Sequence, residues 1–123
     1  MTDITIISGI HYTIDPDAIE TITDRDEHGA AGTFLHGVTR GVLEIADPID
    51  VFLAKIPTQF AKLTRVDNSA IWFNADAVSA LGPAANLAPA AHTNVWVGGS
   101  SEPVTETLAA AKAAINAKRK APM

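Results

Sequence analysis

The segment IDPDAIETI, residues 14–22, returns later in the chain as FNADAVSAL, residues 73–81. A shift of 59 positions, from residue 14 to residue 73, aligns the two segments and places apolar residues on apolar residues. The same shift lays DITII, residues 3–7, on KLTRV, residues 62–66. Self-similarity at a fixed spacing is typical of repeated structural units, so the sequence predicts two copies of one small unit.

The segments around each copy follow a similar order of strand-like runs, turn signals and a final helical run. This order predicts an α+β, mainly β fold made of two tandem pseudo-symmetric repeats. Each repeat is expected to consist of short antiparallel strands followed by a short helix. The predicted boundaries are a first repeat over residues 1–56, a linker over 57–61 and a second repeat over 62–120.

In the first copy, the β-branched runs ITII and HYTI are separated by Ser8 and Gly9, which predicts a tight hairpin. The Asp-Pro-Asp sequence that begins at Asp15 is typical of a turn or helix start, because Asp accepts backbone N–H bonds and Pro presets φ. The next residues, AIETI, fit either a helical turn or a strand. Polar residues 23–32 predict a loop, and the apolar spacing in residues 48–56 predicts a short helix.

In the second copy, Asp67, Asn68 and Ser69 stand where the hairpin turn is expected. Residues 82–91 form a Pro- and Ala-rich counterpart of the first loop, and GGSSEP, residues 98–103, predicts a turn before the strand VTET. The alanine-rich residues 108–118 predict a final helix with a thin apolar face, suited to close packing against a flat surface or a partner.

Composition excludes several classes of protein. With 47% hydrophobic and 19% charged residues, the chain differs from the polar composition of disordered proteins. A chain of 123 residues buries roughly two-thirds of its unfolded surface, enough for a stable core without staples. It contains no Cys, which removes thiol catalysis and Cys-based zinc sites. The start MTDITII lacks a basic leader, and no apolar run reaches the ~18 residues of a membrane span, so we expect a cytoplasmic protein and no membrane partner.

The second half, KLTRVDNSAIWFNADAVSAL followed by TNVWVGGSSEPVTETLAAAKAAI, resembles the small flagellar FlbD/SwrD family. The matching residues are Lys62 to Arg65, Asn74, Asp76, Thr93 to Val97, and Gly98 with Gly99. Members of that family are single-copy, and Ala75 stands where the family has Pro. The first half matches through Asp15-Pro16-Asp17 and residues 32–41. The resemblance implies a β-rich module without enzymatic activity that acts by contact with other proteins.

The residues with catalytic or metal-binding chemistry do not form a known motif. The four histidines are far apart in sequence and lack the spacing of a metal site: His11, His28, His36 and His92. No serine lies in a G-x-S-x-G motif. The acidic residues Asp24, Asp26 and Glu27 lack the pattern of a calcium loop and are interpreted as a solvated surface. We therefore predict no catalytic residue, no metal site and no cofactor.

The charge balance argues against nucleic acid as a partner. The chain has 9 Lys and Arg against 14 Asp and Glu, a net charge of −5. Its cations gather near the C-terminus while the first half is acidic, an asymmetry suited to head-to-tail contacts between copies. The predicted interface residues combine these cations with two aromatic residues: Trp72, Trp96, Lys112, Lys118, Arg119 and Lys120. For the two tryptophans, packing in the core is the favoured alternative.

Two functions follow as hypotheses. The first is a non-enzymatic protein-interaction or assembly module that contacts itself or a larger structure, for example a phage virion component such as a decoration protein. Its location would then be the cytoplasm or the virion. The second is a small-ligand-binding regulator or sponge protein, with the ligand held between the two repeats.

Overall fold

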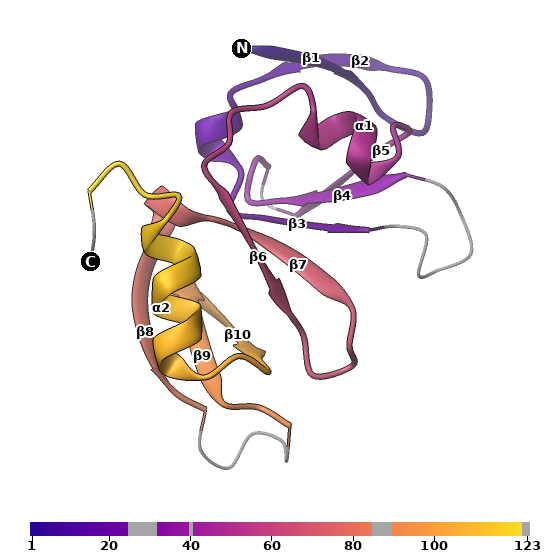
Figure 1. Ribbon diagram of the computed structural model, residues 1–123. Coiled ribbons are helices and arrows are strands. Elements are labelled where there is room, and N and C mark those ends of the chain that lie inside the picture. The colour runs from indigo at the N-terminus through magenta and orange to yellow at the C-terminus, as the bar shows by residue number, and fades with distance from the viewer. Residues whose placement is uncertain (25–31, 40, 85–89, 122–123) are drawn as a thin grey trace. The chain divides into compact units, whose positions relative to one another are not determined.

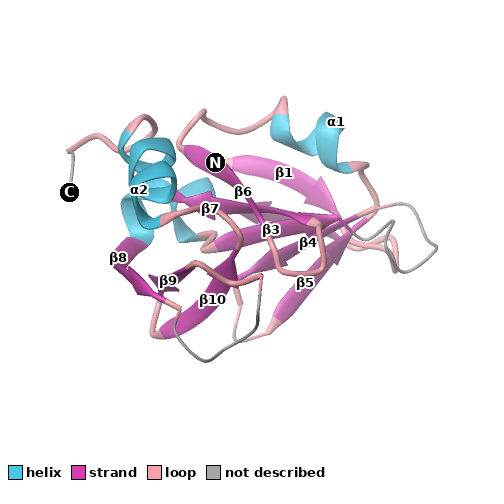
Figure 2. Ribbon diagram, turned by 60° about the horizontal axis from the view of Figure 1, so that its bottom comes forward, coloured by secondary structure: helices cyan, strands magenta, loops and turns pink. Residues whose placement is uncertain are grey.

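The computed structural model describes residues 1–24, 32–39, 41–84 and 90–121, shown in Figure 1. The chain divides into two compact units, unit 1 (Met1–Thr58) and unit 2 (Gln59–Met123). Strands outnumber helices in the described residues, as Figure 2 shows, so the predicted α+β, mainly β fold class is confirmed.

Unit 1 contains two groups of antiparallel strands and two short helical segments. Its elements are β1 (Thr2–Thr5), β2 (His11–Ile14), the 3-10 turn η1 (Pro16–Ala18), β3 (Thr21–Asp24), β4 (Thr33–His36), β5 (Val42–Ile45) and α1 (Ile49–Leu53). Strands β1 and β2 form a hairpin, and β4 pairs with both β3 and β5. A bridge between Ile6 and Ile45 connects the hairpin to β5. The core is formed by fully buried side chains that include Ile19, Ile22, Leu35, Ile45 and Phe52.

Unit 2 has the same kinds of element in the same order. They are β6 (Phe60–Thr64), β7 (Ala70–Asn74), the 3-10 turn η3 (Ala75–Ala77), β8 (Val78–Pro83), β9 (Thr93–Val97), β10 (Ser100–Val104) and α2 (Leu108–Asn116). Strands β6 and β7 form a hairpin, β9 pairs with both β8 and β10, and Arg65 bridges to Val104. Helix α2 packs against β6 and β8.

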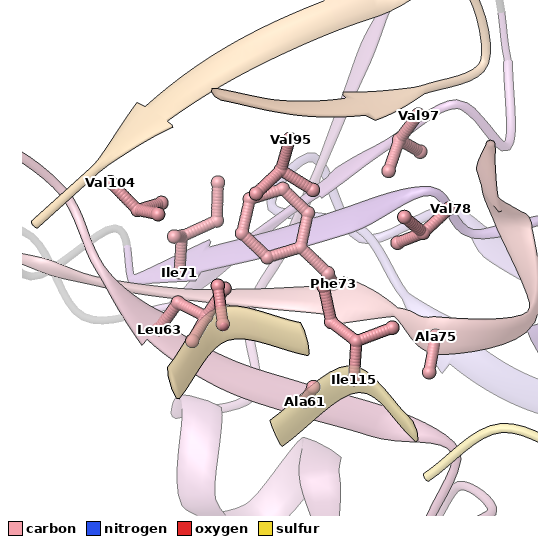
Figure 3. Packing of buried hydrophobic residues seen from close by; sticks show 11 residues of the cluster. Ala61, Leu63, Ile71, Phe73, Ala75, Val78, Val95, Val97, Val104 and Ile115 are labelled. Atoms are coloured by element: carbon pink, nitrogen blue, oxygen red, sulfur yellow. The ribbon is translucent and has the colours of Figure 1, made fainter. Parts of the chain in front are cut away.

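The core of unit 2 surrounds Phe73, which projects from β7. Figure 3 shows its ring near the middle of the cluster, with aliphatic side chains from the strands and from α2 around it. The buried members are Ala61, Leu63, Ile71, Phe73, Ala75, Val78, Val95, Val97, Val104, Ala111 and Ile115. Burial of aliphatic surface from every strand and from α2 holds this unit together.

The hydrogen bonds of the two units also correspond. The N–H of Ala46 donates to Thr5 O, and the N–H of Thr105 donates to Thr64 O. The 59-position shift places the first donor and acceptor on the second donor and acceptor. Likewise Gly9 N donates to Ile6 O in the first hairpin turn, and Asn68 N donates to Arg65 O in the second. Gly9 and Asn68 both have positive φ, 92° and 70°, a conformation that Gly adopts freely and Asn tolerates.

The helical turns η1 and η3 are capped at equivalent places. The side chain of Asp15 accepts a hydrogen bond from the N–H of Asp17 at 3.0 Å, and Asn74 accepts one from Asp76 at 3.2 Å. These bonds satisfy an N–H group at the start of each turn, which is the usual role of Asp and Asn there. AIETI, which fitted either a helical turn or a strand, completes η1 and then enters β3.

Several predicted boundaries differ from the structure. Strand β6 begins at Phe60, inside the segment predicted as linker. The turn predicted over residues 98–103 is confined to Gly98 and Gly99, whose φ values are 57° and 85°. Two such residues form a tight hairpin loop, so β10 begins directly after them and covers Ser100–Val104. The strand predicted over VTET is therefore wrong, because β10 ends at the first residue of that segment. Helix α1 covers only Ile49–Leu53 of the predicted 48–56.

Candidate functional site

Trp96 lies on the outer face of the β8–β9–β10 sheet. Along β9, Thr93, Val95 and Val97 are buried, whereas Trp96 points the other way and is 42% exposed. Its cross-strand neighbours are Ala80 on β8 and Ser101 on β10. Since both neighbours are small, the indole stands open on this face. The interpretation of Trp96 as a core residue is therefore wrong.

The neighbouring outward residue on β9 is Asn94, whose partners across the sheet are Gly82 and Pro103. Its amide Oδ1 is buried and has no hydrogen-bond partner among the residues that the structure describes. A buried acceptor in this state destabilises the fold by about 1–3 kcal/mol. This polar atom therefore lowers the stability of unit 2 and is not open to solvent.

Trp72 lies on β7 directly opposite Lys62 of β6 and is half-buried. The Nζ atom of Lys62 is 5.4 Å from the centroid of the Trp72 ring. This geometry permits a cation–π interaction of about 0.5–1 kcal/mol at an exposed site. Trp72 thus interacts within its own hairpin and is less open than Trp96.

The four predicted C-terminal cations differ in their surroundings. Lys112, Lys118 and Lys120 are exposed, and the backbone N–H of Lys120 donates to the Asp76 carboxylate at 2.9 Å. Arg119, in contrast, uses Nη1 to donate to the backbone carbonyl oxygens of Ala75 and Val78. The side chain of Arg119 therefore links the segment after α2 to η3 and β8 by hydrogen bonds. The three lysines, in contrast, carry solvent-exposed positive charge.

A charged cluster that the sequence did not single out lies where the β6–β7 turn approaches β10. It consists of Arg65, Asp67 and Glu102. Hydrogen bonds from the Ser69 hydroxyl and backbone N–H lower the pKa of Asp67. Burial raises the pKa of the half-buried Glu102, against the opposing effect of the nearby Arg65 charge.

The signal for this cluster was present in the 59-position alignment. Arg65 aligns with Ile6, and Glu102 aligns with Leu43. Two apolar positions of unit 1 are thus charged in unit 2, an exchange that only a residue-by-residue comparison of the copies reveals. A perturbed carboxyl beside an arginine is a feature of functional sites and of structural ion pairs alike.

The raised pKa of Glu102 leads to a pH-dependent prediction. The folded protein holds this proton more tightly than the unfolded chain, whose carboxyl titrates near 4.5, so the free energy of unfolding falls as pH rises through the raised pKa. Glu102→Gln removes this loss. We expect the stability of the variant relative to wild type to increase between about pH 4 and pH 7, measured by urea denaturation at several pH values. Parallel pH profiles for the two proteins would contradict the assignment.

The histidines make local contacts or stand apart. His11 Nδ1 is 3.0 Å from the Thr5 hydroxyl, and His36 Nε2 is 3.1 Å from the Thr23 hydroxyl. His92 is exposed before β9. His28, Asp26 and Glu27 lie outside the described residues. Within residues 1–24, 32–39, 41–84 and 90–121, no three His, Asp or Glu side chains converge as metal ligands.

No family model, curated protein or solved structure matches this chain. Among the described residues, no helix is both long and apolar enough to span a membrane.

Proposed function

We propose that this chain is a non-enzymatic protein-interaction and assembly module. The observation that carries the proposal is Trp96, a large aromatic side chain displayed on an open sheet face between small neighbours. Trp contributes disproportionately to binding energy when a partner removes it from water.

We further propose that the two units arose by tandem duplication, which their shared element order and equivalent hydrogen bonds support. The resemblance of the second half to the FlbD/SwrD family agrees with a role through protein contacts. A virion component, such as a decoration protein that sits on a larger particle, is one concrete form of this role. The protein would then act in the virion and otherwise in the cytoplasm.

Trp96→Ala tests the proposal. Because the indole packs on an open face, we expect a loss in the free energy of unfolding of at most about 1 kcal/mol, measured by denaturant titration. Association with the partner or with other copies should weaken by about 30-fold, the equivalent of a 2 kcal/mol hot spot, measured by native mass spectrometry across a dilution series.

The matched control is Val51→Ala, which shortens an exposed apolar side chain on α1 of unit 1. This variant should leave both stability and association near wild type. A Trp96→Ala protein that unfolds easily but associates normally would assign the indole a structural role and refute its place in the interface.

A small-ligand-binding regulator is the second candidate. The observation in its favour is the charged cluster of Arg65, Asp67 and Glu102, which supplies groups of both signs at one end of unit 2. A rise in melting temperature on addition of nucleotide-like anions, lost in Arg65→Ala, would favour this function over assembly.

A further inference from the structure

The β1–β2 hairpin of unit 1 carries an apolar face that is buried in one part and exposed to solvent in another. Ile4 and Ile14 are buried on this face, and Tyr12 is the cross-strand partner of Ile4. Tyr12 is nevertheless 40% exposed, and Ile10, two residues earlier on the same face, is 55% exposed. Ile7, in the turn between the strands, is also exposed. An apolar group of this kind is typical of a contact surface.

The corresponding face of unit 2 is closed. The 59-position shift places Tyr12 on Ile71, which is only 4% exposed within the unit 2 core, and Ile10 on the polar Ser69. The equivalent positions Tyr12 and Ile71 therefore differ in burial between the two units. In unit 2 the position completes the core, whereas in unit 1 it presents aromatic and aliphatic side chains outward.

Strand β2 also has the exposure of an edge strand. Three consecutive residues, His11, Tyr12 and Thr13, are exposed, and β2 pairs with β1 alone among the described strands. An edge strand offers unpaired backbone groups as well as side chains to another chain. The side chains of β2 are therefore open to contact with another chain.

The charges of the two units indicate which surface fits this hairpin. Residues 1–58 contain ten Asp and Glu and three Lys and Arg, a formal net charge of −7. Residues 59–123 contain four and six, a net charge of +2. Asp15 and Asp17 directly follow β2 and are exposed. Opposite charges favour contact between unit 1 of one copy and unit 2 of another.

Helix α2 of unit 2 has a matching outer face. Its buried side is formed by Ala111 and Ile115, and its exposed residues include Leu108, which is 43% exposed, Ala109, Ala113 and the cation Lys112. Small alanines let another backbone approach closely, and Leu108 supplies an apolar contact. Lys112 and the exposed Lys118 after the helix supply positive charge.

We propose that the outer face of α2 in one copy packs on the β1–β2 hairpin of a second copy. The proposal rests on the proposed assembly function and identifies the partner as another copy of this chain. The contact joins two different surfaces, so each copy keeps one surface open, and the assembly grows into a ring or an extended array.

Two variants with opposite defects test the contact. Ile10→Ser with Tyr12→Ser removes the apolar hairpin face, and Lys112→Glu with Lys118→Glu reverses the charge of the α2 face. Wild type is expected to form concentration-dependent multimers, and each variant alone should associate at least about tenfold more weakly. An equimolar mixture of the two variants should form a heterodimer and nothing larger. The hairpin variant keeps an intact α2 face and the α2 variant keeps an intact hairpin, so the two chains can make one contact only. Native mass spectrometry reports these species directly.

Asp17→Lys provides a second hairpin variant that leaves the apolar residues in place, and circular dichroism checks the fold of every variant. Multimers that persist in all three variants would overturn the proposed contact. If Trp96→Ala still weakens association in that case, the proposed assembly function stands. A wild-type protein that stays monomeric at about 100 μM would also overturn the proposed contact, and so would a mixture of the two variants that stays monomeric. Binding of monomeric wild type to a different protein through Trp96 would leave the proposed function standing.

Discussion

Phe73→Ala is expected to lower the free energy of unfolding of unit 2 by about 3–5 kcal/mol. The ring is almost completely buried and lies in the cluster formed by all five strands and α2. Truncation removes the aromatic surface from the core and leaves a cavity that the surrounding backbone can fill only in part. Urea denaturation followed by far-UV circular dichroism measures this loss.

Trp72→Ala is the matched control, because Trp72 is the adjacent residue on the opposite face of β7 and is half-buried. Its removal forfeits the contact with Lys62 but opens no cavity in the core. We expect it to be clearly the milder of the two substitutions. Equal losses for both variants would contradict the placement of Phe73 at the centre of the core.

Arg119→Ala is expected to destabilise unit 2 by about 1.5–3 kcal/mol, the range for a hydrogen bond that involves a charged group. Nη1 of Arg119 donates to the carbonyl oxygens of Ala75 at 2.8 Å and Val78 at 2.9 Å. These carbonyls belong to η3 and to the first residue of β8, so the side chain ties the end of the chain to the turn between β7 and β8. The melting temperature and the urea midpoint both report the change.

The adjacent Lys118 offers the control, since its side chain is exposed. Lys118→Ala should change the free energy of unfolding by no more than about 0.5 kcal/mol, as is usual for surface positions. Conversely, an Arg119→Ala protein with wild-type stability and reduced association would assign Arg119 to an intermolecular interface, as the sequence predicted.

The parts of the fold that depend on local chemistry could be predicted from the sequence. Asp15 and Asn74 cap the turns that follow them, and apolar alternation locates the strands on either side. Strand β5, Val42–Ile45, occupies the apolar VLEI segment, which glycine-containing residues 37–41 precede and Asp47-Pro48 follows.

The remaining features depend on residues distant in sequence. Trp96 and the buried Val97 are adjacent in β9, and packing of the sheet against β6, β7 and α2 determines which of the two faces the core. The role of Arg119 requires carbonyls more than forty positions away, and the burial that raises the pKa of Glu102 arises only when β10 meets the β6–β7 hairpin. The alignment of the two copies shows that Arg65 and Glu102 replace apolar residues, but the contacts of these side chains form only in the folded chain.

The central claim, that this chain functions by assembly, is tested most directly by native mass spectrometry of the wild-type protein across a dilution series at low and high ionic strength. We predict defined multimers without added mass, which dissociate on dilution and more readily at high salt because units of opposite net charge attract each other. A monomer at every concentration that carries the mass of a small molecule would contradict the account and favour the ligand-binding function.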